Sequence, residues 1–273
     1  MTGGEKVFGA IYGDIIGSYY ENHCTKSYGF LFAKDSSFTD DSVMIAAVCS
    51  TILNDPSEIG ILGIRARSRQ FASRYRQFYS QYPDAGFGKM FSEWAKDPYA
   101  KNNRSYANGA AMRVMPIVYA YSEWNQMMRQ VEASCLPTHN SREAKTAAYA
   151  VAAAIRMALD GKNKAEIRKY IQDKYYGLSQ PLEQIRATHV FDSRASYSVP
   201  PAITAFLESH DYESAIRNAV SLGGDADTQA CIAGGIAEAY YHEIPNHIKE
   251  FCDKKLSMTT IKTVVKQFEE KYG

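Results

Sequence analysis

Apolar residues recur along nearly the whole chain at the three- and four-residue spacing of amphipathic helices, and no run alternates as a half-buried strand would. The pattern therefore predicts an all-α fold. Helices are expected over 7–22, 41–53, 55–82, 87–96, 110–121, 123–134, 140–159, 163–176, 202–209, 212–222, 227–242, 246–255 and 259–271.

Start signals support several of these helices. Thr39 is expected to cap the second helix, and Pro56 occupies a first helical position of the third. Asn140 with Glu143 three residues later resembles a capping box. The segment 178–199 is predicted to be irregular. No repeat or low-complexity linker divides the chain, so residues 1–273 are expected to form a single domain.

Composition narrows the class of protein. Hydrophobic residues make up 45% and charged residues 22%, with a formal net charge of +1, so any electrostatic function must depend on local clusters. Asp14 interrupts the first apolar run, and no uncharged stretch is long enough for a membrane span. Five cysteines without a Cys-x-x-Cys pair indicate a reducing, cytoplasmic environment. The chain shows no heptad or interface stripe and is expected to be a monomer.

Two short acidic segments stand at predicted helix starts. Residues 39–42 read Thr-Asp-Asp-Ser, and residues 225–228 read Asp-Ala-Asp-Thr. Each segment alone is explained by helix capping. Together they offer four carboxylates and hydroxyl oxygens, the ligands that Mg²⁺ and Mn²⁺ prefer. If the fold brings them together, cations must neutralise the crowded charge.

The first helix adds a third acidic element. Asp14, Gly17 and Glu21 share one helical stripe, and a glycine between two acids lets a ligand or a neighbouring backbone approach closely. Isoleucines flank Asp14, which argues against a solvated position. Gly9, Gly13 and Gly17 form a four-residue ladder that predicts a close contact with another helix.

Five segments make the sequence recognisable: GAIYGDIIGSYYE, FTDDSVMIAAV, NGAAMRVMPI, THNSREA and SLGGDADTQACIAGGIAEAYY, in that order. They resemble the ADP-ribosylglycohydrolase family, which includes dinitrogenase reductase-activating glycohydrolase and its animal relatives. The resemblance spans roughly residues 9 to 245, and length and texture are most similar to the compact bacterial members. It implies a multi-helix orthogonal bundle that binds two divalent cations, Mg²⁺ or Mn²⁺.

The resemblance also implies roles for matching residues. Glu21 matches an acid beside the metals that acts in catalysis or gating, and Asp225 is the second candidate catalytic carboxylate. His139 matches a position on the ligand side. The metal ligands would be Thr39, Asp40, Asp41, Asp225, Asp227 and Thr228, and the loop that cradles the diphosphate and adenosine would include Ser105, Tyr106, Asn108 and Gly109.

The implied reaction is hydrolysis of the N- or O-glycosidic bond between ADP-ribose and a protein, nucleic acid or small molecule. Such cleavage passes through an oxocarbenium-like state, and paired metals can orient or deprotonate the attacking water. A nearby carboxylate would act as acid or base. The sequence leaves open the linkage, the physiological metal and whether Glu21 is base, acid or gate.

Departures from the family pattern are few. Ser42 stands where the family usually has threonine, and Ala107 and Ala110 replace residues that are often glycine. Two alternatives remain: a non-catalytic ADP-ribose or nucleotide binder, and a dinuclear metal phosphohydrolase acting on a nucleotide. Every expected metal-ligand position keeps an oxygen donor, which favours the hydrolase.

Overall fold

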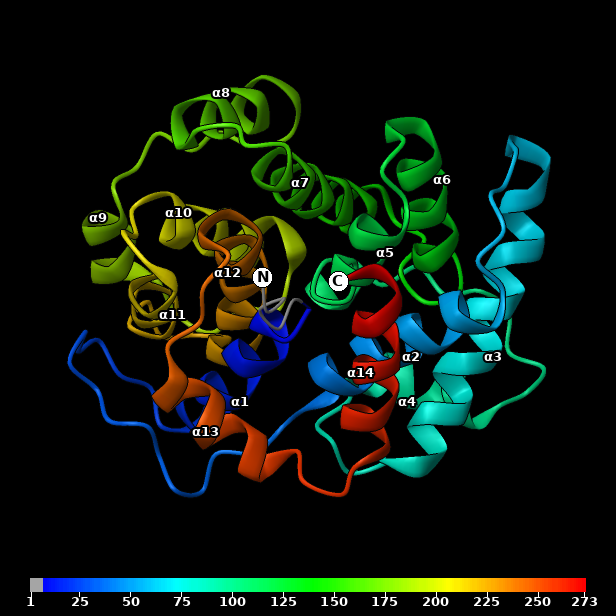
Figure 1. Ribbon diagram of the computed structural model, residues 1–273, viewed down its shortest axis with the longest axis horizontal. Helices are drawn as coiled ribbons and strands as arrows, with labels where there is room; N and C mark the ends of the chain where they lie inside the picture. Colours follow the sequence, from blue (N-terminus) through cyan, green and yellow to red (C-terminus); the bar gives the residue numbers. More distant parts are fainter. Residues whose placement is uncertain (1–6) are drawn as a thin grey trace.

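The computed structural model describes residues 7–273, and helices account for its architecture (Figure 1). This confirms the all-α expectation. Within the described residues, bridges of the β type occur only as two isolated pairs, Arg104 with His139 and Ala107 with Arg194. The α-helices are α1 (Gly9–Asn22), α2 (Asp40–Asn54), α3 (Ile64–Gln81), α4 (Lys89–Lys96), α5 (Met115–Ala120), α6 (Trp124–Cys135), α7 (Arg142–Leu159), α8 (Lys164–Lys174), α9 (Leu182–Thr188), α10 (Ala195–Leu207), α11 (Tyr212–Val220), α12 (Ala226–Tyr241), α13 (Asn246–Lys255) and α14 (Thr260–Tyr272), with short 3-10 helices at Ile61–Gly63 and Asn108–Ala110.

Helix α1 packs against α12, so the first and the last of the five sequence motifs lie side by side. The glycine ladder of α1 faces the backbone of α12, as the sequence predicts. A Cβ atom on Gly13 would lie 2.1 Å from the carbonyl oxygen of Ala230, and one on Gly17 would lie 2.4 Å from that of Ala226. Only glycine permits this approach. The contact sets the acidic start of α12 against the acidic stripe of α1.

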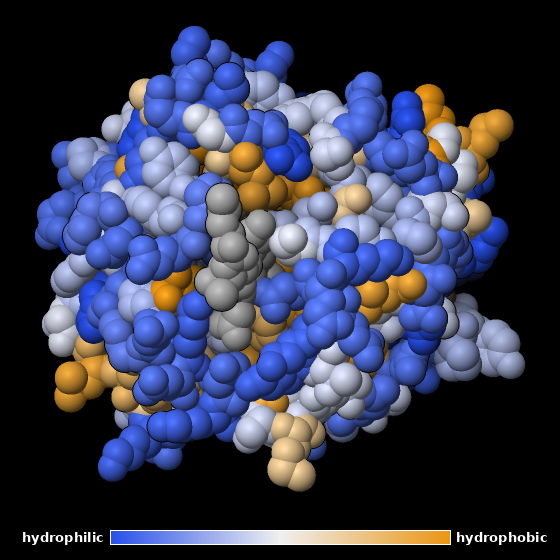
Figure 2. Space-filling model, in the orientation of Figure 1, coloured by the Kyte–Doolittle hydropathy of each residue, from blue (hydrophilic) through white to orange (hydrophobic). Residues whose placement is uncertain are grey.

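The remaining helices enclose this pair. Helix α12 packs against α7, α10 and α11 as well as α1, while α2 packs against α1, α3 and α14 (Figure 1). Large side chains such as Phe8, Tyr212 and Phe206 are fully buried in the core, and burying one such side chain stabilises the fold by about 1.5–3 kcal/mol. Hydrophilic residues cover most of the face seen in Figure 2, where apolar residues reach the surface in separate groups.

The third helix begins later than the sequence predicts. Helix α3 starts at Ile64, and residues 55–60 form an irregular segment. The Asp55 carboxylate accepts the Ser57 N–H over 3.0 Å, and its own N–H bonds to the Thr51 carbonyl oxygen. Asp55 therefore closes α2 and folds a local turn that competes with helix formation.

Helix α10 runs through two prolines that were expected to precede it. It begins at Ala195 and contains Pro200 and Pro201. Proline removes a backbone donor and crowds the preceding turn, but Val199, Ala202 and their neighbours are buried against α7, α11 and α12. Burial in the core therefore overrides the local preference. Part of the segment predicted to be irregular is also helical, as α9.

The helices and the cysteines can be compared with what the composition predicted. Among residues 7–273, no helix combines the length and apolar character that a membrane crossing requires. All five cysteines are free, and Cys24 is the exposed one.

Candidate active site

Asp14 holds the start of α2. Its Oδ2 accepts the backbone N–H groups of Thr39 and Ser42 over 3.0 and 3.1 Å, and its Oδ1 accepts the Thr39 hydroxyl over 2.7 Å. The Ser42 hydroxyl also donates to Oδ2. Asp14 is fully buried. Through these hydrogen bonds it caps the N-terminus of α2, although it belongs to α1. This fixes the position of Asp40 and Asp41, and the departure from threonine at Ser42 keeps the hydroxyl that the contact uses.

The second acidic segment is placed by a glycine turn. Gly223 and Gly224 have φ values of +70° and +80°, in the left-handed region. A Cβ atom on Gly224 would also lie 2.7 Å from the carbonyl oxygen of Val190. The turn delivers Asp225 to the start of α12, where Asp227 and Thr228 occupy the first turn.

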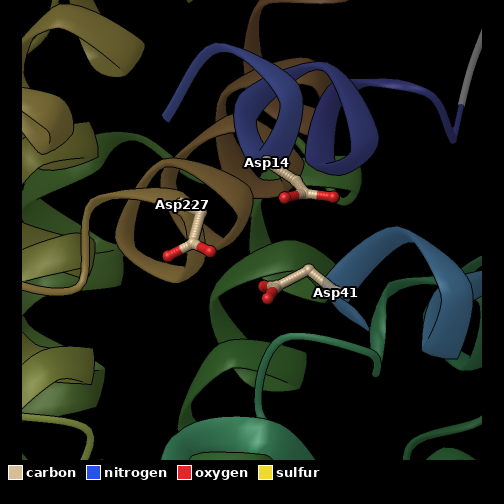
Figure 3. Close-up of side chains that lie close together, drawn as sticks. All are labelled: Asp14, Asp41 and Asp227. Carbon is tan, nitrogen blue, oxygen red and sulfur yellow. The ribbon is translucent and has the colours of Figure 1, made fainter. Parts of the chain in front are cut away.

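The two acidic segments meet. The Thr228 hydroxyl donates to Oδ2 of Asp41 over 3.1 Å. Carboxylate oxygens of Asp14, Asp41 and Asp227 lie within 4.8 Å of one another, and the three side chains reach toward a common space from α1, α2 and α12 (Figure 3). Oxygens of Glu21, Asp225 and Asp227 also lie within 4.8 Å of one another.

This crowding changes the acidity of the carboxyl groups. Burial, reinforced by the neighbouring carboxylates, raises the pKa of Asp41 and of Asp227 well above the ordinary value. The same causes raise the pKa of Asp40 to about 8 and raise that of Glu21. The buried Oδ1 of Asp41 has no hydrogen-bond partner among the described residues. Oxygen donors this crowded fit divalent cations, whose charge would favour the ionised carboxylates.

A cavity of about 380 Å³, termed here the main cavity, opens over these groups. Asp41 does not line it but is bonded to Thr228, which does. The structure thus brings every site residue predicted from the sequence into one region. Those that line the main cavity are Glu21, Thr39, Asp40, Ser105, Tyr106, Asn108, Gly109, His139, Asp225, Asp227 and Thr228.

Asn108 serves the acidic cluster directly. Its side-chain amide donates to Oδ2 of Asp225 over 2.7 Å and to the Ser198 hydroxyl over 3.0 Å, and its backbone N–H bonds to the Ser193 carbonyl oxygen. The prediction that Asn108 cradles the diphosphate stays a prediction, and the structure adds a direct hydrogen bond from its side chain to Asp225. No sequence signal pointed to Ser198, which lies in the segment expected to be irregular.

His139 is held by a buried chain of hydrogen bonds. Nη2 of Arg113, a fully buried residue, donates to the Thr138 hydroxyl over 3.0 Å, and that hydroxyl shares a hydrogen bond of 2.8 Å with Nδ1 of His139. Burial, and then the charge of Arg113, lowers the pKa of His139 well below its ordinary value. The imidazole is therefore neutral, and its Nε2 lies beside Gly109.

Three further residues line the main cavity, and the sequence predicted no role for any of them: Met90, Arg113 and Phe191. Arg113 lies inside the NGAAMRVMPI segment, so the motif itself marked that stretch of chain. By contrast, Met90, in the first turn of α4, and Phe191, in the loop before α10, line the main cavity from segments between the motifs. Tyr106 and Phe191 are 56% and 57% exposed, so two aromatic rings stand partly in solvent at this cavity.

Comparisons with known proteins point to one family. The family model described as ADP-ribosylglycohydrolase matches residues 6–272. The chain is 26% identical to the human protein named ADP-ribosylhydrolase ARH3, over 90% of this chain and 87% of that one. It is 25% identical to a putative ADP-ribosyl glycohydrolase, L543, of Acanthamoeba polyphaga mimivirus, over 88% and 87%.

A solved structure shares the fold. It is described as an ADP-ribosylglycohydrolase-related protein complex and superposes with a TM-score of 0.72 at 23% identity, covering 96% of each chain. The family match extends over nearly the whole chain and includes both acidic segments. The chain belongs to the ADP-ribosylglycohydrolase family.

Proposed function

We propose that this protein is a metal-dependent hydrolase that cleaves the glycosidic bond joining ADP-ribose to a modified protein, nucleic acid or small molecule, and releases ADP-ribose. The observation that carries the proposal is the meeting of residues 39–42 and 225–228 beside Glu21 at one cavity. Membership in the family supports the same reaction class.

The residues present fit two divalent cations. Thr39, Asp40 and Asp41 would hold one side of the site, and Asp225, Asp227 and Thr228 the other, all through oxygen. The unpartnered Oδ1 of Asp41 and the raised carboxyl pKa values are the expected features of a cation site. When bound, Mg²⁺ or Mn²⁺ would supply Lewis acidity toward the ribose oxygens and water.

Glu21 is the proposed acid–base group. Its carboxyl group is half-buried at the edge of the acidic cluster, and burial, with the charges of Asp225 and Asp14, raises its pKa. A raised carboxyl pKa makes the carboxylate a stronger proton acceptor. Glu21 would accept a proton from the attacking water, while Asp225, oriented by Asn108, is the second candidate for that role.

The remainder of the main cavity suits ADP-ribose. If the Thr138 hydroxyl donates to Nδ1, Nε2 of His139 carries the proton and offers a neutral N–H donor to an oxygen of the diphosphate. Ser105 and Gly109 line the same wall. The exposed rings of Tyr106 and Phe191 offer flat faces for the adenine base.

The test is detection of free ADP-ribose by mass spectrometry from arginine-, serine- and nucleic-acid-linked substrates, each with Mg²⁺ and with EDTA. Metal-dependent release from any of them supports the proposal, and an Asp225→Asn protein should lose that release. Retention of ADP-ribose without turnover would indicate the non-catalytic binder. Release of AMP or phosphate would indicate the phosphohydrolase.

A further inference from the structure

A pocket of about 460 Å³, termed here the basic pocket, lies at the start of α7. Three of its lining residues carry positive charge, namely Arg104, Arg142 and Lys145, and none of the described residues that line it is an aspartate or a glutamate. The whole chain has a formal net charge of only +1, so this positive cluster is a local feature. Such a pocket attracts anions.

The basic pocket and the main cavity use the same two extended segments of chain. The Asn140 N–H donates to the Asn103 carbonyl oxygen over 3.2 Å, and Arg104 pairs with His139 as an antiparallel bridge. Successive side chains of an extended chain point to opposite faces. Asn103 and Ser105 line the main cavity, whereas Arg104 between them lines the basic pocket. The basic pocket is therefore separate from the main cavity, although both depend on this wall.

The guanidinium groups at the basic pocket have no partner within the protein. Arg104 and Arg142 are exposed, and within residues 7–273 neither guanidinium group takes part in an ion pair or a hydrogen bond. Nζ of Lys145 lies 3.9 Å from Oε1 of Glu132, and both side chains are partly exposed, so this pair contributes little. A guanidinium group presents paired N–H donors that match two oxygens of a phosphate group.

Helix α7 directs its polar groups into the basic pocket from one face. Arg142, Thr146 and Tyr149, all lining residues, are spaced at i, i+4 and i+7. Thr146 and Tyr149 add hydroxyl donors to the positive charge. Glu143, the acid in the first turn of α7, accepts the Ser196 N–H over 3.1 Å and the Ser196 hydroxyl over 2.5 Å. Its carboxylate is therefore bound to α10 and does not line the basic pocket.

The start of α7 is fixed to the wall of the main cavity. The Ser141 hydroxyl donates to the Ser105 carbonyl oxygen over 2.8 Å and accepts the Ala144 N–H over 3.1 Å, which caps the helix. The positive end of the helix dipole thus adds to the charge of the side chains at the basic pocket. A framework fixed before binding lowers the ordering cost of binding a ligand.

We propose that the basic pocket binds a phosphate group, at a site separate from the diphosphate site of the main cavity. Arg104 binds the phosphate oxygens from the wall and Arg142 binds them from α7, while Lys145 adds a third positive charge. Coulomb attraction grows with the charge of the ligand, so three cations favour a doubly charged phosphate over a singly charged carboxylate. Inorganic phosphate and the terminal phosphate of a phosphoester share this chemistry. The proposal does not depend on the hydrolase function.

The test is calorimetric titration with inorganic phosphate and, separately, with glycerol 3-phosphate, at low ionic strength and with EDTA to keep metal ions from binding the probes. Each probe is expected to bind saturably. Arg104→Gln combined with Arg142→Gln should weaken binding by about three- to thirtyfold, the range for losing two exposed charge contacts. In the wild type, amide hydrogen exchange over 103–105 and 140–145 should slow when phosphate binds, because the ligand joins the wall to α7.

Arg65→Gln combined with Arg69→Gln is the matched control, because both are exposed arginines of α3 outside the basic pocket and the main cavity. It removes the same charge and should keep the wild-type affinity. Tighter binding of glycerol 3-phosphate than of inorganic phosphate would identify a phosphoester as the ligand, and the reverse order would identify the free ion. The proposal would be overturned if neither probe bound saturably, if the Arg104 and Arg142 double variant kept the wild-type affinity, or if both double variants weakened binding equally.

Discussion

Thr228 donates a hydrogen bond from its hydroxyl to Oδ2 of Asp41 over 3.1 Å, across 187 positions of the chain. The bond joins the start of α12 to the start of α2, the two helices that carry the acidic segments. Both helix N-termini face the cluster, so their dipoles relieve part of the repulsion among the carboxylates. The remainder of that repulsion is what a bound cation would remove.

Cation binding is therefore expected to stabilise the folded protein. At a hundredfold excess of Mg²⁺ or Mn²⁺ over Kd, the free energy of unfolding should rise by about 2.7 kcal/mol, because the unfolded chain does not assemble the site. Thermal unfolding with added metal and with EDTA measures the effect. The variant Asp41→Asn combined with Asp227→Asn should abolish the metal response, whereas Glu58→Gln, which changes an exposed acid outside the main cavity, should retain it. A metal response that survives the double variant would place the cations elsewhere.

The cap that Asp14 provides predicts a large cost for its loss. An asparagine there would turn amide hydrogens toward some of the four donors from Thr39 and Ser42 that the carboxylate now accepts. Leaving such buried donors unpaired should lower the free energy of unfolding by about 3 kcal/mol. Urea titration in EDTA measures this change separately from metal binding. Ser42→Ala, which removes one donor, should cost about 1 kcal/mol. Equal stability of Asp14→Asn and the wild type would contradict the capping role.

For Asp14, the sequence predicted the position of the side chain but not its hydrogen-bond partners. Its flanking isoleucines predicted burial, and the spacing of Asp14, Gly17 and Glu21 predicted one acidic stripe. The capping contact with Thr39 was not predictable, because it depends on how α1 lies against the start of α2. Local composition identified the ligand types, whereas their hydrogen-bond partners were set by packing between distant segments.

Packing between distant segments also explains two other features that the sequence did not predict. The Arg113–Thr138–His139 chain joins residues of two separate motifs, and nothing in either motif indicates that they touch. Helix α10 passes through Pro200 because its neighbours bury it, although the local rule predicted a break there. By contrast, the glycine ladder of α1 was readable in advance, since four-residue spacing and the absence of Cβ atoms define a close helix contact by themselves.

The bond from Asn108 to Asp225 predicts an effect on catalysis without a loss of fold. Asn108→Ala removes the 2.7 Å contact that orients this carboxylate. Losing a group that orients a metal ligand typically costs 10- to 100-fold, so kcat/KM for ADP-ribose release should fall by about that factor. Steady-state kinetics at saturating Mg²⁺ measures the change. The Ser198 hydroxyl also accepts a hydrogen bond from the Asn108 amide. Ser198→Ala removes that bond but leaves the bond to Asp225 in place, so it should lower kcat/KM less. A loss for Asn108→Ala no larger than that for Ser198→Ala would contradict the orienting role.

Glu238 predicts a pH dependence of stability that is separate from the metal site. This buried residue of α12 accepts the Val7 N–H over 2.9 Å, and burial raises the pKa of its carboxyl group to about 8 from an ordinary value of 4.5. Between those two pH values the folded state holds a proton that the unfolded chain releases. The contribution of Glu238 to stability therefore falls as pH rises through this window, by at most about 1.4 kcal/mol per pH unit, and levels off above pH 8.

Urea unfolding of the wild type and Glu238→Gln at several pH values between 5 and 8 isolates this term, because other carboxyl groups contribute equally to both proteins. The glutamine keeps an oxygen acceptor for the Val7 N–H and cannot ionise. The wild type should therefore lose stability relative to Glu238→Gln as pH rises, while the exposed control Glu58→Gln runs parallel to the wild type. Parallel curves for Glu238→Gln and the wild type would mean that the folded protein already carries Glu238 ionised in this range.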